Sequence, residues 1–199
     1  MTILLTAFVP FGGDRQNASL EVMKALPDRI GGTELIKLSL PVAFGRAGEM
    51  AIEAAEGLHP DAVVCLGQAG GRTEITPERV AINLMDGRIP DNDGFQPADT
   101  PIDPDGPAAF FSSLPIRAMV KAMEDSGVPA RISNTAGTYV CNDLMYRTLR
   151  WAARKHPGLP CGFIHVPYLA EQEPGEGVPT LPKAAVVRAV EAALAVLEQ

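Results

Sequence analysis

The chain has 199 residues, of which 46% are hydrophobic and 21% are charged, and this composition excludes a disordered or fibrous protein. Every apolar run is far shorter than the ~18 residues of a membrane helix, so we expect no membrane-spanning segment. The net charge is −7 and no stretch clusters Lys and Arg, so we expect neither nucleic acid nor an anionic membrane as a partner.

The length fits a single domain over residues 1–199, which would bury about 70% of the surface of the unfolded chain. Residues 1–8 are apolar but follow no basic stretch and meet Pro10 and Gly12 at once, which favours a first strand over a signal peptide. Three cysteines without a CxxC pair are typical of reduced thiols, so a cytoplasmic location is predicted.

Segments rich in β-branched residues alternate along the chain with segments of helical spacing. Strands are predicted over 2–8, 34–40, 61–66, 80–84, 131–134 and 162–166. Helices are predicted over 19–26, with Ser19 as its cap, and over 44–58, 115–126, 142–155 and 181–197.

This alternation predicts an α/β fold with a central, mostly parallel sheet and helices on both faces. Ligands of such sheets bind beyond the carboxyl ends of the strands, so the polar residues there are the first candidates for a functional site. Residues 85–115 are dense in Pro, Gly and Asp and exceed an ordinary connection in length. We expect that segment to be a lid, an interface or both.

The histidines and two of the cysteines divide into structural and functional candidates. His59 and His156 each precede a proline where a predicted helix ends, which indicates a capping role. Cys65 and Cys161 lie in apolar strand segments and are interpreted as core thiols. His165 stands near the end of an apolar strand, where a hydrogen-bonded core histidine and a catalytic base are both reasonable interpretations.

Cys141 follows a predicted strand and turn and stands directly before a predicted helix. The N–H groups and the dipole of a helix N-terminus lower a thiol pKa and can hold a developing oxyanion, although a buried structural thiol is the alternative. A nucleophilic thiol needs a base, and His165 would reach the same sheet edge. Of the acids nearby, Glu74 is interpreted as a surface residue. Glu78 would either orient the base or pair with Arg79 or another arginine.

Two loops beside predicted strand ends are candidates for ligand contact. Residues 67–72 are rich in glycine but lack the GxGxxG and GK[ST] patterns, so they predict close approach to a small ligand rather than nucleotide binding. Phe8 and Phe11 would either form the walls of a flat pocket or pack in the core.

Five segments together resemble the cysteine-type pyroglutamyl peptidases, also called pyrrolidone-carboxylate peptidases. The segments are LLTAFVPFGG (4–13), GQAGGRTEITPERVAIN (67–83), RIPDNDG (88–94), SNTAGTYVCN (133–142) and GFIHVPY (162–168). They span the chain almost end to end in the order of the family, which makes the resemblance specific.

The resemblance implies a three-layer α/β/α sandwich with a central, mostly parallel mixed sheet, forming a single catalytic domain. It implies Cys141 as the nucleophile, His165 as the base and Glu78 as the acid that orients the base. The implied activity is removal of an N-terminal pyroglutamyl residue from peptides through a thioester acyl-enzyme. The family needs no metal or cofactor and usually assembles as a homotetramer.

The resemblance also implies the residues that bind substrate. Phe8 and Phe11 would enclose the lactam ring, and Asn17 and Gln68 would supply polar contacts. Arg88 would support the catalytic centre.

The sequence departs from the family at two positions near the expected site. Ala18 stands where proline is frequent, and Tyr139 stands where phenylalanine is common. Neither change removes a catalytic group, but Tyr139 would alter the polarity of the pocket.

Two other functions compete with this hypothesis. A phosphorylase or nucleosidase on a related sheet would leave Cys141 and His165 structural, but no basic cluster near a strand end supplies its anion site. A non-catalytic module for small cyclic amides would bind its ligand without Cys141.

Overall fold

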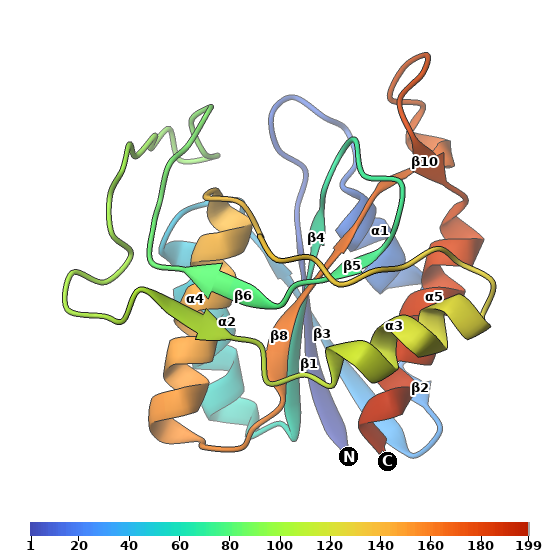
Figure 1. Cartoon of the computed structure of the whole chain (residues 1–199), viewed down its shortest axis with the longest axis horizontal. Helices are drawn as coiled ribbons and strands as arrows, with labels where there is room; N and C mark the ends of the chain where they lie inside the picture. Colours follow the sequence, from blue (N-terminus) through green and yellow to red (C-terminus); the bar gives the residue numbers. More distant parts are fainter. Residues whose placement is uncertain (199) are drawn as a thin grey trace.

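The computed structural model describes residues 1–198 and contains a six-stranded sheet in the order β2-β3-β1-β4-β8-β5 (Figure 1). The four central strands run parallel, and the two edge strands are antiparallel to their neighbours. The strands are β1 (Thr2–Phe8), β2 (Arg29–Ile30), β3 (Thr33–Leu40), β4 (Ala62–Gln68), β5 (Thr76–Pro77) and β8 (Cys161–Val166).

Helices cover both faces of this sheet because successive strand residues point to opposite sides. Ile3, Leu5 and Val64 face the helices on one side, whereas Leu4 and Val63 face those on the other. The helices of the first side are α1 (Ala18–Ala25), α3 (Ile116–Asp125) and α5 (Lys183–Ala195), and those of the second are α2 (Arg46–Leu58) and α4 (Val140–Lys155). Figure 1 shows the two groups on opposite sides of the strands, which confirms the α/β/α sandwich.

Two of the predicted strands behave differently from expectation. Residues 80–84 contribute β6 (Val80–Ile82), which pairs with β7 (Ala109–Phe111) outside the main sheet. Residues 131–134 form no strand, and only isolated bridges at Ala130 and Ser133 remain. The backbone of this segment still pairs with residues 75–79, since Arg131 N donates to Ile75 O and Ser133 N donates to Pro77 O. A further parallel pair, β9 (Tyr168–Leu169) with β10 (Thr180–Leu181), follows β8.

Helix ends are set by specific side chains and turns. Asn17, not Ser19, caps α1, because Asn17 Oδ1 accepts a hydrogen bond of 3.0 Å from Ser19 N. His59 and His156 are the C-caps of α2 and α4, as predicted. Helix α4 begins before residue 142, so Cys141 lies within its first turn rather than ahead of it. Two short 3₁₀ turns are also present: Ala170–Gln172 follows β9, and Val196–Glu198 follows α5.

The sheet topology locates the ligand site. The chain moves from β1 to β3 on one side and then returns past β1 to β4, so the order switches direction between β1 and β4. The polar residues gather beyond the carboxyl ends of β1, β4 and β8. In residues 1–198, no helix is both long and apolar enough to cross a membrane.

Candidate active site

His165 and Glu78 form a buried pair at the end of β8. His165 Nδ1 lies 2.7 Å from Glu78 Oε1, and the two side chains are 4% and 0% exposed. Glu78 is held next to β8 because its backbone N–H donates to Phe163 O. With Nδ1 occupied by a carboxylate, the ring nitrogen left to act on a substrate is Nε2. The acid predicted to orient the base therefore contacts it directly.

Cys141 lies above the same strands at the N-terminus of α4. Gly67 on β4 is in register with His165 on β8, and a Cβ atom at Gly67 would lie only 3.1 Å from Cys141 Sγ. Glycine is required here because any side chain would also collide with the Phe163 ring, at 2.5 Å. The thiol is partly exposed and lines one pocket with His165. No hydrogen bond joins Cys141 to His165 within residues 1–198.

Burial sets the protonation of all three groups. Burial alone would raise the pKa of Glu78, but the hydrogen bond and charge of His165, aided by Ser133 and then by Arg72, hold that pKa below its usual value. Burial lowers the pKa of His165 against the opposing effect of Glu78. Burial and the Glu78 carboxylate raise the pKa of Cys141 to about 12.

The raised pKa of Cys141 corrects the expectation of a thiolate stabilised by the helix N-terminus. Burial of the sulfur and the Glu78 carboxylate raise this pKa more than Arg72 and the Cys141 backbone N–H lower it. At neutral pH the thiol and the imidazole of the free site are therefore both uncharged.

A pocket of about 490 Å³ opens above these residues. Phe8 and Phe11 line it, as do Asn17, Gln68 and Arg88, so all five residues expected to bind substrate share one cavity with Cys141 and His165. Phe8 is only 2% exposed and packs 6.5 Å from the Phe163 ring, which makes it the floor of the pocket as well as a core residue. Phe11 is half-buried, and the centroid of its ring lies 6.2 Å from the centroid of the Tyr139 ring.

The two polar residues expected to contact substrate are partly occupied within the protein. Asn17 is buried, accepts from Ser19 and donates to Val9 O, so it shapes the pocket wall rather than offering a free amide. Gln68 Oε1 accepts from Ala18 N at 2.8 Å and from Gln172 Nε2 at 2.9 Å. Among the described residues Gln68 Nε2 has no partner, so this amide is the group that can donate to a ligand.

The arginine that supports the acid–base pair is Arg72, which the sequence analysis did not single out. Arg72 Nη1 lies 2.6 Å from Glu78 Oε1, whereas Arg79 instead donates to Asn134 Oδ1. Arg88 is exposed at the pocket wall and makes no ion pair among residues 1–198, so it does not contact Glu78. The sequence offered this pairing only as the alternative in which Glu78 contacts Arg79 or another arginine, and it did not identify Arg72.

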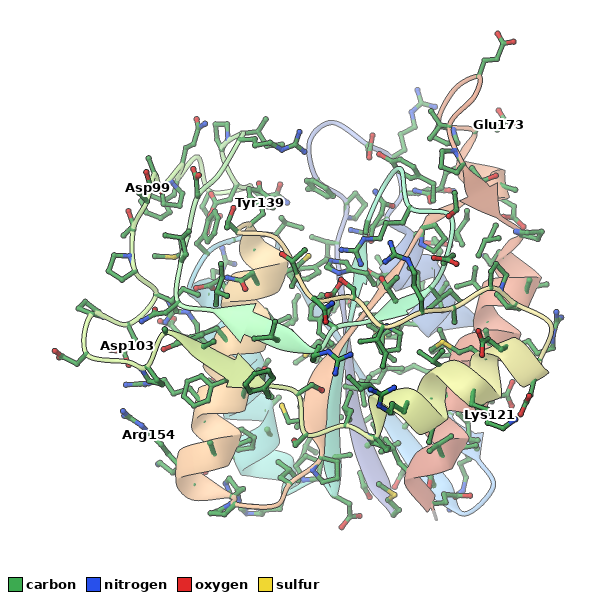
Figure 2. The ribbon with its side chains drawn as sticks, viewed as in Figure 1. Asp99, Asp103, Lys121, Tyr139, Arg154 and Glu173 are labelled. Atoms are coloured by element: carbon green, nitrogen blue, oxygen red, sulfur yellow. The ribbon has the colours of Figure 1, made fainter. Side chains whose placement is uncertain are left out.

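Tyr139 lines the pocket, and its hydroxyl has a partner within the protein. The hydroxyl donates to Pro90 O at 2.9 Å, which ties the residue before α4 to the long segment. The Tyr139 ring meets the Phe44 ring edge-on, with 5.2 Å between the ring centroids. Figure 2 shows Tyr139 at the end of α4 that faces this segment. The effect of Tyr139 on the polarity of the pocket stays a prediction.

The sequence analysis also missed Asn142, the residue after Cys141. Its fully buried side chain accepts from Ile82 N and donates to Ile82 O and Leu84 O, each at 2.9 Å. These bonds fix the first turn of α4 against β6. An asparagine inside a helical pattern gives no sequence signal for such a role, because its partners lie about 60 residues away.

The long segment after β6 forms the outer wall of the pocket. Asp91 organises it by accepting hydrogen bonds from Phe44 N, Asp93 N and Phe95 N. Asp86 N donates to Thr138 O, so the wall is joined to the chain just before Cys141. Figure 2 shows Asp99 and Asp103 on this segment. These hydrogen bonds hold the segment in place as a wall of the pocket. Its role as a lid or an interface stays a prediction.

Comparison with known proteins agrees with this site. A family model described as pyroglutamyl peptidase matches residues 1–199. The chain belongs to the pyroglutamyl peptidase family. It is therefore a hydrolase of the peptidase class, which leaves the phosphorylase and the non-catalytic module without support.

Individual relatives are similar over nearly their whole length. The pyrrolidone-carboxylate peptidase of Levilactobacillus brevis is 49% identical over 98% of this chain and 96% of its own. Pyrrolidone-carboxylate peptidase 1 of Caldanaerobacter subterraneus is 50% identical over 99% and 98%. The crystal structure of pyroglutamyl peptidase I from Bacillus amyloliquefaciens superposes with a TM-score of 0.93 at 42% identity, covering 96% of this chain and 94% of that one. A mutant pyrrolidone carboxyl peptidase from Pyrococcus furiosus gives a TM-score of 0.94 at 40% identity, with 100% and 98% covered.

Proposed function

We propose that this pyroglutamyl peptidase cleaves the amide bond after an N-terminal pyroglutamyl residue with Cys141 as nucleophile, His165 as base and Glu78 as the orienting acid. The observation that carries the proposal is the buried 2.7 Å contact between Glu78 and His165 beneath the pocket that Cys141 lines. The family membership supports the substrate class.

The first half of the reaction forms a thioester. As Cys141 Sγ attacks the carbonyl carbon, its proton passes to His165 Nε2. The resulting imidazolium is stabilised by the Glu78 carboxylate and then donates that proton to the leaving amine nitrogen as the C–N bond breaks. In the second half, water attacks the thioester and gives a proton to His165, which returns it to the departing sulfur.

The oxyanion would be held by the first amides of α4. The N–H groups of Val140 and Cys141 donate to no other residue within residues 1–198, whereas those of Asn142 and Asp143 are already donated to Tyr139 O. Free amides at a helix N-terminus can stabilise a developing negative oxygen by about 3 kcal/mol per donor.

Substrate selection would follow from the chemistry of the pocket. A pyroglutamyl ring is flat and uncharged, so it needs apolar walls such as Phe8 and Phe11 and a few amide partners such as Gln68 Nε2. Arg88 would face the peptide at the rim. A prolyl ring lacks the lactam carbonyl and would leave polar groups of the site unpaired, which disfavours its binding.

Three further properties are proposed with this function. We propose a homotetramer, which rests on the family resemblance, a cytoplasmic location, which rests on the sparse cysteines, and a single catalytic domain, which rests on the chain length. We also propose that the reaction needs no metal or cofactor, because thiol, imidazole and water supply every proton and electron pair in the scheme above.

Hydrolysis of pyroglutamyl-aminocoumarin tests the proposal. The wild-type chain should hydrolyse this substrate but not prolyl-aminocoumarin, and Cys141→Ala should abolish turnover while the circular dichroism spectrum is unchanged. Cys65→Ala is the matched control, because Cys65 is a fully buried core thiol and its loss should leave activity in place. Turnover by Cys141→Ala would refute the assignment of the nucleophile.

A further inference from the structure

We propose that Arg72 is a positioning residue of this site, which fixes Glu78 against His165 and joins that pair to the segment that leads to Cys141. The inference rests on the proposed function, since it concerns the same acid, base and nucleophile. Neither the sequence motifs nor the chemistry of the ring pocket requires a positioning role for Arg72.

The geometry shows one guanidinium group serving several acceptors. Arg72 Nη1 lies 2.6 Å from Glu78 Oε1, the same oxygen that lies 2.7 Å from His165 Nδ1. The same nitrogen contacts Thr76 Oγ1, and Thr76 is in register with His165 across β5 and β8. Arg72 Nη2 donates to Thr135 O at 3.1 Å. A planar fork of this kind fixes direction as well as charge, which a lysine cannot do.

Burial explains why Glu78 needs this partner. The Glu78 side chain is wholly buried, and its other oxygen, Oε2, has no hydrogen-bond partner among the described residues. A carboxylate in such a place is costly without charged partners, and His165 and Arg72 are the two that contact it. Arg72, whose side chain is 22% exposed, supplies the positive charge from the solvent side.

The local sequence delivers Arg72 to this position. Gly71 has a φ of 86°, in the left-handed region that favours glycine, and it turns the chain after β4 back toward the sheet. Gly70 lies so close to Tyr168 that a Cβ atom would be 2.4 Å from the ring. The two glycines therefore allow the turn that carries the guanidinium back over β5.

The charges around His165 determine what removal of Arg72 would do. Glu78 faces the imidazole from the link between β5 and β6, Arg72 from the loop after β4, and Cys141 from α4. Asp86 and Arg88 line the same pocket farther out. Arg72 lowers the pKa of His165, whereas Glu78 raises it. Without the guanidinium the imidazole would bind a proton more readily.

The pH profile of kcat/KM on pyroglutamyl-aminocoumarin tests the inference. Arg72→Gln should lower kcat/KM at neutral pH about 10- to 100-fold, mainly through kcat. It should also move the acid limb upward by about one pH unit, because a positive charge beside His165 is lost. Arg72→Lys retains the charge, so its acid limb should stay within about 0.3 pH units of wild type while kcat falls.

Arg131→Gln is the matched control. Arg131 pairs with Glu74 and so joins the same two chain segments, but outside the site. Its profile and kcat should equal those of wild type. An unmoved acid limb in Arg72→Gln, or equal shifts in the Lys and Gln variants, would overturn the inference. If Arg72→Gln does not fold, an Arg72→Lys profile with wild-type kcat would overturn it as well. An inactive wild-type chain would instead refute the proposed function.

Discussion

Replacing Asn142 by alanine should destabilise the protein and slow the reaction together. The side chain is fully buried and makes three hydrogen bonds of 2.9 Å to the backbone of Ile82 and Leu84. Alanine would remove all three bonds and leave the carbonyl and N–H groups of β6 facing an apolar methyl group. Because Asn142 follows Cys141 directly, the first turn of α4 would lose its anchor.

The structure sets the size of the effect. Each neutral hydrogen bond contributes about 1 kcal/mol net, and a buried group left unpaired costs about 1–3 kcal/mol. Ile82 and Leu84 are partly exposed, so water can reach some of the released groups. We therefore expect a loss of about 2–4 kcal/mol in the free energy of unfolding.

Urea denaturation measures this loss as a lower midpoint at unchanged slope. Asn142→Asp should lose at least as much, because it keeps the acceptor for Ile82 N but places an oxygen against two carbonyl oxygens. Asn134→Ala is the control, since Asn134 is exposed and accepts one bond from Arg79. A loss below about 1 kcal/mol at Asn142 would refute the reasoning, because it would mean that water replaces all three bonds.

The remaining predictions concern charge, access and one hydroxyl. Glu78→Gln should lower kcat at least about 100-fold. It should also move the acid limb of the pH profile of kcat/KM to lower pH, opposite to Arg72→Gln, because the Glu78 charge raises the pKa of His165. Iodoacetamide should label only Cys141 in the folded protein, at a rate that still rises above pH 8, and a plateau at mildly acidic pH would contradict the raised pKa. Tyr139→Phe should cost about 1 kcal/mol in unfolding free energy and change KM less than about twofold, since the hydroxyl contacts Pro90 O and not the pocket.

Regular elements with a clear period were predictable from the sequence. The first strand, Thr2–Phe8, has the predicted bounds, and Pro115 and Gly127 flank α3 as helix-end rules require. The failures occurred where the pairing of a segment is short or interrupted. Residues 131–134 have strand-like composition and donate backbone hydrogen bonds to Ile75 O and Pro77 O, but the pairing amounts to isolated bridges and not to a continuous strand.

The sequence predicted which residues meet at the candidate site, but not which hydrogen bonds and ion pairs they form there. Positions at the start of a helix and the end of a strand made Cys141 and His165 candidates, and the resemblance to the pyroglutamyl peptidases favoured them over structural roles. The partners of those residues depend on register and on side-chain reach across the sheet. No periodicity encodes that the guanidinium at 72 reaches Glu78, or that Asn142 reaches back to β6.

The burial of the site determines how its charges are used. A separated thiolate and imidazolium would lose their hydration, and burial accordingly raises the pKa of Cys141 to about 12 and lowers that of His165. Charge would then develop only while the sulfur attacks and its proton moves, when the substrate oxygen becomes the negative group. The free amides at the start of α4 would meet that oxygen, and Glu78 would meet the imidazolium. The helix N-terminus would therefore act mainly on the transition state, while burial and the Glu78 carboxylate keep the resting thiol of Cys141 uncharged.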